Sequence, residues 1–261
     1  MKDDKTVGPL FAGRKNRILD FLLFFFLISS ILVFYRFECL RAQIDPARQW
    51  HLLCTKIREG VISKQEAQPQ VKSLEILLRE FYQSHSGVRE KESLCFPLEG
   101  YHSGSIGGND GSGYQIEGYD FFDGNRHKGH PGHDIFIRDK NQDGLDDVTG
   151  KPVNVISASS GIVVSINLDW KPSSPIRGGN YIWIYEPVTS RYYYYSHLNE
   201  IFVETGQVVN RGEKIGTVGR TGKNAYSKRS PTHLHFTVHQ SMARYPKPIN
   251  PYRDLTKVGF E

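Results

Sequence analysis

Hydrophobic positions from residue 44 to 85 recur at helical spacing. The recurring positions are Trp50, Leu53, Ile57 and Val61 in a first segment, and Val71, Leu74, Leu77, Leu78 and Phe81 in a second. Side chains three or four residues apart share one face of a helix. Pro69, which lacks a backbone N–H, is expected to separate the two segments. The pattern predicts a helical hairpin that packs on the main domain or forms a stalk, with a partner-binding surface as the alternative.

After residue 150 the pattern changes to short β-branched or aromatic runs. Clusters of Gly, Pro, Asn or Asp bound most of these runs, and no long helical pattern interrupts them. The runs cover residues 153–156, 161–166, 181–185, 192–196, 214–218 and 233–239. We therefore predict a mainly β domain, built as an antiparallel sheet or sandwich with short hairpins.

An apolar block runs from Ile18 to Tyr35 and is preceded by basic residues at 14, 15 and 17. Positive charge before such a block favours an N-terminus left in the cytoplasm. We expect the block to act as a signal peptide or an uncleaved membrane anchor, rather than as a buried core helix. The expected organisation is a cytoplasmic tip with this segment at 1–42, a helical hairpin region at 43–95 and the β domain at 96–261.

The 261-residue chain has a formal net charge of +5 and a pI of about 9.0. This mild basicity suits an anionic envelope polymer or a membrane surface, and equally suits ordinary solubility. Basic residues are dispersed without a recognised motif, so no nucleic-acid partner is predicted. Cys39, Cys54 and Cys95 form no CxxC pair. A disulfide between Cys54 and Cys95 and two buried thiols both remain open.

Two short motifs could together hold a metal ion. Residues two apart on a strand share a face, so His233 and His235 should project side by side with Leu234 turned into the core. His130 and Asp134 lie four residues apart around a glycine turn. These two residues plus one of the paired histidines give three protein ligands. A hydrolytic zinc site has this ligand count, with a fourth position open for water.

A third motif, Tyr195-Ser196-His197-Leu198, lies between the first two in the chain. The ordered set H-x-G-x-D, Y-x-H-L and H-L-H-F, across roughly residues 96 to 255, resembles the LytM/lysostaphin-type zinc metallopeptidases. The resemblance implies the duplicated hybrid motif fold of that family. It makes His130, Asp134 and His235 the zinc ligands, and His197 and His233 the unliganded catalytic histidines.

Other histidines fit the motifs less well. His127 also begins an H-x-G sequence, but its fifth position is Pro131, which cannot bind a metal. His127 and His133 are therefore expected to be bystanders. His133 stays an alternative extra ligand, although strand alternation turns it away from Asp134. His239 lies four residues beyond His235, too far along the strand to share the same ion, so a surface or core role is expected.

Two stretches depart from the family pattern. Residues 228–232 lack the small residues expected before the H-L-H-F motif, which puts the local cleft wall and the substrate preference in doubt. An inserted acidic loop carries oxygen side chains at Asp139, Asn141, Asp143 and Asp147 and resembles the start of a calcium loop. Its twelfth position is Gly150 instead of glutamate, so a structural calcium ion and a solvated acidic turn both remain open.

These features predict a zinc-dependent metalloendopeptidase of the cell envelope. By resemblance, its substrate is the peptide of peptidoglycan, cut in stem peptides or cross-bridges, and the membrane is a further partner if the N-terminal segment stays uncleaved. The alternative is a non-catalytic envelope module of the same fold that binds the wall or activates another hydrolase. A lipoyl-type carrier is disfavoured because Lys214 lies inside a strand-like run rather than at a hairpin tip.

Overall fold

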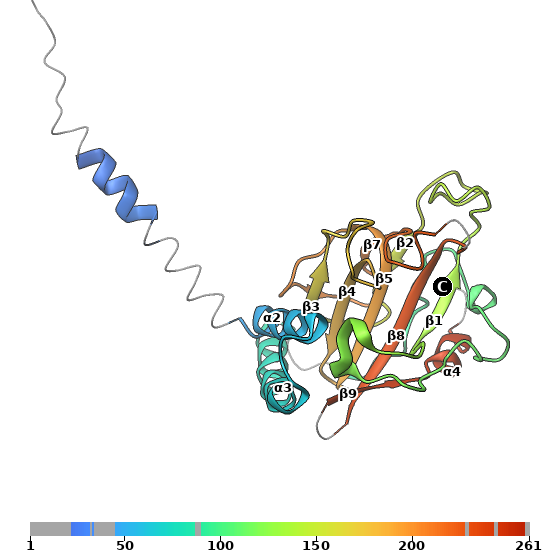
Figure 1. Cartoon of the computed structure of the whole chain (residues 1–261), viewed down its shortest axis with the longest axis horizontal. Coiled ribbons are helices and arrows are strands. Elements are labelled where there is room, and N and C mark those ends of the chain that lie inside the picture. The colour runs from blue at the N-terminus through green and yellow to red at the C-terminus, as the bar shows by residue number, and fades with distance from the viewer. Residues whose placement is uncertain are drawn as a thin grey trace, which may run out of the picture. The chain divides into compact units, whose positions relative to one another are not determined.

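The computed structural model describes residues 22–31, 33, 45–86, 90–227, 230–242 and 245–258 (Figure 1). Residues 22–31 and 33 are helical and belong to a different compact unit from the one that begins at Asp45. The rest of the predicted apolar block, and Cys39, lie outside the described residues. None of the helices in the described ranges is both long and apolar enough to span a membrane. The export segment therefore stays a prediction.

The nine described strands form one antiparallel sheet (Figure 1). Its main path runs β1–β8–β5–β4–β3–β6, while β2 pairs with β7, β7 also pairs with β5, and β9 pairs with β8. The strands are β1 (His133–Phe136), β2 (Asn154–Ile156), β3 (Gly161–Asn167), β4 (Asn180–Glu186), β5 (Arg191–Ile201), β6 (Val208–Val209), β7 (Lys214–Val218), β8 (His233–Met242) and β9 (Tyr245–Ile249). The predicted mainly β class is confirmed, in its single-sheet form.

Each of the six predicted runs overlaps a strand, and only Val153 of the first run lies outside one. The runs did not include β1, β6 or β9, and the β9 sequence Tyr-Pro-Lys-Pro-Ile contains two prolines. Proline cannot donate a ladder hydrogen bond and is confined to edges or bulges, so this sequence reads poorly as a strand. In the described chain β9 pairs only with β8, where the edge position accommodates Pro246 and Pro248.

Strand alternation gives the sheet two different faces. On one face Leu234, Phe236 and Val238 of β8 join Tyr193 and Tyr195 of β5 in a core that is almost completely buried. On the other face a second cluster combines aromatic side chains of β4 and β5 with residues of the helices. His233 and His235 alternate with Leu234 and therefore belong to this second face.

Two helices cover part of the second face, α2 (Pro46–Glu59) and α3 (Lys64–Ser86). Asp45 caps α2 by accepting hydrogen bonds from two backbone N–H groups, and Gly60 ends it with a left-handed φ of 70°. Ser63 and Glu66 then form a reciprocal capping box that starts α3. The predicted break at Pro69 is wrong, because these caps place the turn at residues 60–63 and leave Pro69 inside α3.

Trp50 joins the helical region to the sheet. The side chain is 1% exposed, stacks on Tyr192 of β5 at 5.1 Å between ring centroids, and packs against Trp183 of β4. Its indole Nε1 donates to the Tyr192 hydroxyl at 3.2 Å, and that hydroxyl donates to Glu75 of α3 at 2.9 Å. The helical hairpin therefore packs on the sheet, as one of the two sequence-based alternatives predicted.

Three shorter helical segments complete the described elements. They are η1 (Ser103–Ser105), η2 (Phe121–Arg126) and α4 (Tyr252–Thr256). In η2, Phe121 and Phe122 enter the second cluster beside Trp50, so this segment covers the sheet next to α2.

The two described cysteines are buried and form no disulfide with each other. Cys54 belongs to the second cluster, whereas the Cys95 thiol donates to the Ser157 carbonyl at 3.1 Å. Burial raises the pKa of the Cys54 thiol to about 12, so this group stays protonated. The buried-thiol alternative is the correct one for this pair.

We predict that Trp50→Ala lowers the free energy of unfolding by about 3–5 kcal/mol, because it empties the contact between α2 and the sheet. Leu52→Ala, two residues along the same helix at a side chain that is 58% exposed, should change it by about 0.5 kcal/mol or less. Urea unfolding of both variants measures the difference. If both variants lost a similarly small free energy of unfolding, the proposed role of Trp50 in holding α2 on the sheet would be contradicted.

Candidate metal centre and adjoining pocket

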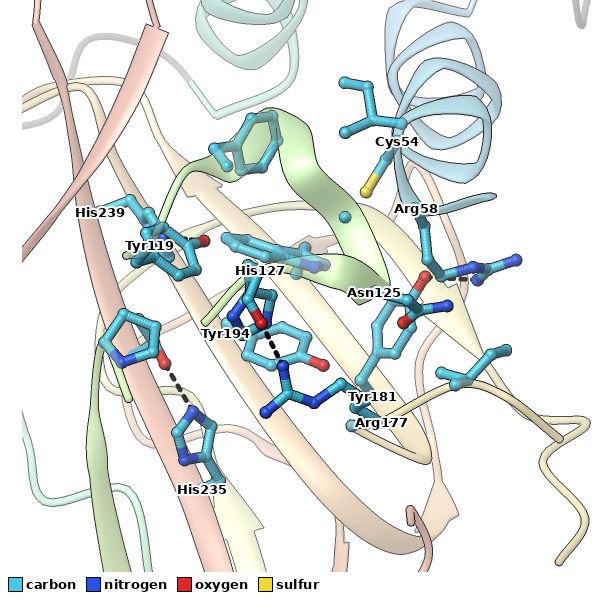
Figure 2. A pocket seen from close by; sticks show the side chains of 18 residues that line it. Cys54, Arg58, Tyr119, Asn125, His127, Arg177, Tyr181, Tyr194, His235 and His239 are labelled. Atoms are coloured by element: carbon cyan, nitrogen blue, oxygen red, sulfur yellow. Dashed lines mark hydrogen bonds between the residues drawn. The ribbon is translucent and has the colours of Figure 1, made fainter. Parts of the chain in front are cut away.

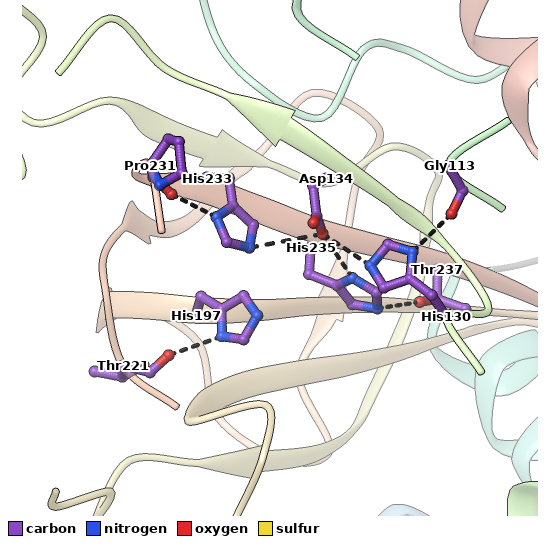
Figure 3. A network of polar contacts seen from close by, with 9 residues as sticks. All are labelled: Gly113, His130, Asp134, His197, Thr221, Pro231, His233, His235 and Thr237. Carbon is purple, nitrogen blue, oxygen red and sulfur yellow. Dashed lines mark hydrogen bonds and ion pairs between the residues drawn. The ribbon is translucent and has the colours of Figure 1, made fainter. Parts of the chain in front are cut away.

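Strand register brings the distant motifs together at one end of the sheet. In the β1–β8 pair, Asp134 lies directly opposite His235. In the β8–β5 pair, Ser196 lies opposite His235, so His197 follows immediately beside it. His130 precedes β1 and is held by backbone bonds to Gln115 in both directions. Figure 3 shows these histidine rings gathered around Asp134.

Asp134 is the centre of this group. Its Oδ1 lies 3.1 Å from His130 Nε2, 2.9 Å from His235 Nδ1 and 3.6 Å from His233 Nε2 (Figure 3). Among the described residues, His130, Asp134 and His235 form the one set of potential ligands whose donor atoms all lie within 4.8 Å of one another. These three are the residues that the sequence motifs predict as ligands.

Backbone carbonyls orient three of the rings. His130 Nδ1 lies 2.8 Å from the Gly113 oxygen, His233 Nδ1 2.7 Å from the Pro231 oxygen, and His197 Nδ1 2.7 Å from the Thr221 oxygen. A carbonyl can only accept, so each of these Nδ1 atoms must donate. In the neutral ring, Nε2 then carries a lone pair.

This orientation tests whether the residues fit a cation. The lone pair of His130 Nε2 faces a carboxylate oxygen of Asp134, and two acceptors at 3.1 Å need a proton or a cation between them. Tetrahedral zinc with bonds of about 2.0–2.1 Å separates its ligand atoms by about 3.3 Å. The distances from Asp134 Oδ1 to His130 and His235 are close to this value. The donor set of two imidazole nitrogens and one carboxylate also suits zinc.

Asp134 and the neighbouring histidines shift one another's pKa values. Although burial alone would raise the pKa of Asp134, hydrogen bonds from His130 and His235 hold it far below the usual range. Burial alone would lower the pKa of His130, but the hydrogen bond and charge of Asp134 raise it. For His235, burial outweighs the same carboxylate and lowers the pKa. Asp134 is therefore ionised and His235 favours the neutral form that binds a metal.

His197 lies beside the group in an unusual backbone conformation. Its φ is 66°, a left-handed value that is uncommon for a residue with a side chain, and its N–H donates to the Gly178 carbonyl at 2.9 Å. Its ring centroid lies 4.9 Å from that of His233. Burial, followed by the charges of His233 and His235, lowers the pKa of His197 to about 3. His197 is thus a neutral ring whose Nε2 can accept a proton.

Three further histidines that the sequence analysis considered lie outside the group. His133 points to Asn250, with Nε2 2.8 Å from its side-chain oxygen, and is not part of the metal-binding set. His239 is buried on the second face of the sheet, where its Nε2 lies 2.8 Å from the Tyr119 hydroxyl. His127 lies beside the Tyr119 ring, with 4.8 Å between the centroids. The predicted core role of His239 agrees with this position.

The acidic loop satisfies its oxygens without a cation. Asp139 accepts from the backbone of Asp143 and Gly144 and from the Thr232 hydroxyl, while Asp147 accepts from the backbone of Lys140. Across the described ranges, the carboxylates of this loop do not form a group close enough to share an ion. The calcium alternative for Asp139, Asn141, Asp143 and Asp147 is therefore not supported, and the loop is an acidic turn tied to the residue before His233.

A pocket of about 110 Å³, partly open to solvent, adjoins the metal centre (Figure 2). It extends from His235 and Thr237 on β8 to Cys54, Ile57 and Arg58 on α2. Between these ends it is lined by Tyr119, Phe121, Gly124, Asn125, His127, Pro131, Ile176, Arg177, Gly178, Tyr181, Trp183, Tyr194 and His239. The sequence motifs gave no signal for it, because its walls come from five separate segments.

We predict that His239 makes the protein sensitive to acid. Burial, followed by the charges of His127 and His235, lowers its pKa from 6.5 to about 3. Below pH 6.5 the unfolded chain therefore binds a proton that the folded chain excludes, and stability falls by about 1.4 kcal/mol per pH unit until the folded pKa is reached.

The test compares the free energy of unfolding at pH 7.5 and 4.5. Wild type should lose free energy of unfolding between pH 7.5 and 4.5, and His239→Phe should lose about 2–3 kcal/mol less. The variant lacks the imidazole that takes up a proton when the chain unfolds. His85→Gln, at an exposed position on α3, should keep the wild-type loss. An unchanged loss in His239→Phe would show that His239 is protonated in the folded protein.

Part of the chain is similar to proteins of known activity. Residues 140–251 match the model of Peptidase family M23, a range that contains His197, His233 and His235 and begins after Asp134. The L-Ala–D-Glu endopeptidase of Bacillus subtilis (strain 168) is 32% identical over 72 residues, which cover 26% of this chain and 22% of that protein.

Solved structures of similar proteins include lysostaphin from Staphylococcus simulans, an antimicrobial peptidase, at 27% identity and a TM-score of 0.37. That match covers 56% of this chain and 49% of lysostaphin. A putative glycyl-glycine endopeptidase LytM from Ruminococcus gnavus matches at 21% identity and a TM-score of 0.42, covering 74% of this chain and 72% of that one.

The chain thus spans about a fifth of the length of its curated relative and about half that of lysostaphin. Within this span, the family match agrees with the resemblance predicted from the three sequence motifs. Residues 140–251 are therefore similar to Peptidase family M23, and this range carries the second and third of the sequence motifs.

Proposed function

We propose that this chain is a zinc-dependent metalloendopeptidase that hydrolyses peptide bonds in peptidoglycan. The observation that carries the proposal is the convergence of His130 Nε2, Asp134 Oδ1 and His235 Nδ1, with His197 and His233 beside them. This set combines three ligands with two further nitrogens that are not needed to hold the ion, as hydrolysis requires.

We assign His130, Asp134 and His235 as the zinc ligands. When bound, zinc would polarise the scissile carbonyl and make the attacking water more acidic. The Gly113 carbonyl fixes the His130 ring so that Nε2 points toward the ion, as partners behind metal ligands generally do. The Thr237 hydroxyl, 3.0 Å from His235 Nε2, orients the second imidazole in the same way.

We assign His233 and His197 as the catalytic histidines. Each donates its Nδ1 proton to a backbone carbonyl and therefore presents an Nε2 lone pair. Either nitrogen can take the proton of the attacking water and then donate a proton to the leaving amine. Burial lowers the pKa of His197 to about 3, so its ring is neutral near pH 7 and its Nε2 lone pair is free.

The substrate assignment is supported by the family match and by the name of the curated relative. An L-Ala–D-Glu endopeptidase cuts a peptide bond beside an acidic residue, and the chain shares 32% identity with it over 72 residues. We therefore propose peptidoglycan stem peptides or cross-bridges as the substrate class. The apolar block at 18–35 supports action in the cell envelope, with residues 1–42 as the export segment, 43–95 as the helical region and 96–261 as the peptidase domain.

We expect His130→Ala, Asp134→Ala and His235→Ala to lose most bound zinc, because each removes one of three protein ligands. His197→Ala should retain zinc, because its ring is not a ligand, and His127→Ala serves as a control at a pocket histidine outside the set. Zinc per protein molecule, measured by elemental analysis after gel filtration, tests this. Full zinc in His235→Ala would refute the ligand assignment.

We also expect the full chain to digest purified peptidoglycan, and a chelator to stop the digestion until zinc is restored. His197→Ala and His233→Ala should each lower kcat by about 10²–10⁴-fold, because a positioned proton acceptor is lost. Release of new amino termini measures turnover. If the zinc-loaded wild type releases none, the non-catalytic envelope module becomes the better account.

A further inference from the structure

The pocket beside the metal centre has an uneven charge. Among the residues that line it, two are arginines, Arg58 and Arg177, and none is an aspartate or glutamate. Guanidinium groups stay protonated throughout the physiological pH range, so these two side chains are the permanent cations of the lining.

Arg177 stands at the end of the pocket near the metal centre. It precedes Gly178, whose carbonyl accepts from the backbone N–H of His197, and its guanidinium donates to the His127 carbonyl (Figure 2). The acceptor is a neutral group. Within the described chain, no carboxylate pairs with Arg177, so its charge is not neutralised by the protein.

Arg58 stands at the end formed by α2. Its Nη1 donates to the Tyr181 hydroxyl at 2.7 Å, and its Nη2 to the exposed carboxylate of Glu59 at 3.0 Å. Its Nε is buried and, within the described ranges, has no hydrogen-bond partner. A buried donor without a partner is uncommon in folded proteins and points to an acceptor that the protein itself does not supply.

Aromatic side chains form the surface between the two arginines. The rings of Trp183 and Tyr194 are tilted by 35° with 4.6 Å between their centroids, and the Tyr181 centroid lies 5.4 Å from that of Tyr194. An apolar surface lowers the local dielectric, so a charge-assisted hydrogen bond made there is stronger than one in water. The pocket thus combines an aromatic surface with a guanidinium group at either end.

We propose that this pocket binds the substrate residue next to the scissile bond and selects one that carries a free carboxylate, with Arg177 as its principal ligand and Arg58 as the second cation. Guanidinium groups bind carboxylates through paired N–H donors, and arginine is the residue best shaped for this contact. The inference rests on the proposed peptidase function and adds to it the acidic character of the substrate.

The helical region has a role in this specificity. Residues 54, 57 and 58 belong to α2, yet they line the pocket that begins at His235. Because Trp50 anchors α2 to β4 and β5, the position of Arg58 relative to the metal centre is set by packing rather than by a loop. The region before the peptidase motifs is therefore part of the substrate site.

The test compares two tripeptides that contain L-Ala–D-Glu and differ only in one group: the D-Glu carboxylate is free in one and a carboxamide in the other. Fluorescence anisotropy measures their Kd for the full chain in the presence of a chelator, so that no turnover is needed. We expect the wild type to bind the carboxylate about tenfold or more tightly, as charge-assisted hydrogen bonds generally allow.

Arg177→Gln should remove this preference, and Arg177→Lys should retain part of it because the charge stays while the paired geometry is lost. Arg126→Gln is the control: it removes a charge at an exposed position of η2 that does not line the pocket. This variant should keep the wild-type preference for the carboxylate. Thermal unfolding of each variant confirms that it folds. High salt should weaken carboxylate binding more than carboxamide binding.

Equal affinity of the wild type for both tripeptides would overturn the inference, and so would a preference that survives in Arg177→Gln. Neither result depends on catalysis. Digestion of peptidoglycan by the zinc-loaded wild type reports separately on the proposed function, so failure of the specificity and failure of the peptidase are distinguishable.

Discussion

The antiparallel pairing of β1 with β8 is the constraint on which the site depends. Its register sets Asp134 directly opposite His235, and the next pairing sets Ser196 opposite the same residue. Because side chains alternate along a strand, a shift of one residue would turn His235 into the core and Leu234 toward the carboxylate. The apolar face of β8 opposes such a shift, since Leu234, Phe236 and Val238 are all buried. Packing on one face thus secures chemistry on the other.

Much of this arrangement could be predicted from local sequence. The alternation around Leu234 gives the direction of His233 and His235, and four residues around a glycine turn bring His130 near Asp134. The meeting of these segments across 101 positions could not be derived from periodicity. It came from the resemblance, which supplied the long-range pairing. The prediction placed the boundary between the two helices at Pro69. The capping residues Gly60, Ser63 and Glu66 place it at residues 60–63 instead.

The pocket escaped prediction for a different reason. Its lining comes from α2, η2, the loop before β4 and three strands, and no local pattern marks Arg58 or Arg177 as partners. The aromatic stretch that begins at Tyr119 contributes both to the core and to the pocket, because Phe121 packs on Trp50 and also borders the pocket. Tertiary packing gives such residues a role that composition alone does not indicate.

The acidic loop shows how an oxygen-rich sequence can serve packing instead of ion binding. Asp139 accepts from two backbone N–H groups within the loop and from the Thr232 hydroxyl, which in turn accepts from Arg220. These bonds hold the residue before His233 and so help to fix the start of β8. The same carboxylate that suggested a calcium site therefore supports the strand that carries the histidines.

The central claim is that one ion is held by two imidazole nitrogens and one carboxylate oxygen from β8, β1 and the turn before β1. Diffraction data collected on crystals of the zinc-loaded protein at the zinc absorption edge test it most directly. The account predicts a single anomalous peak within about 2.0–2.2 Å of His130 Nε2, Asp134 Oδ1 and His235 Nδ1. A peak elsewhere, or an ion bound through His197 or His233 in place of one of these residues, would contradict it.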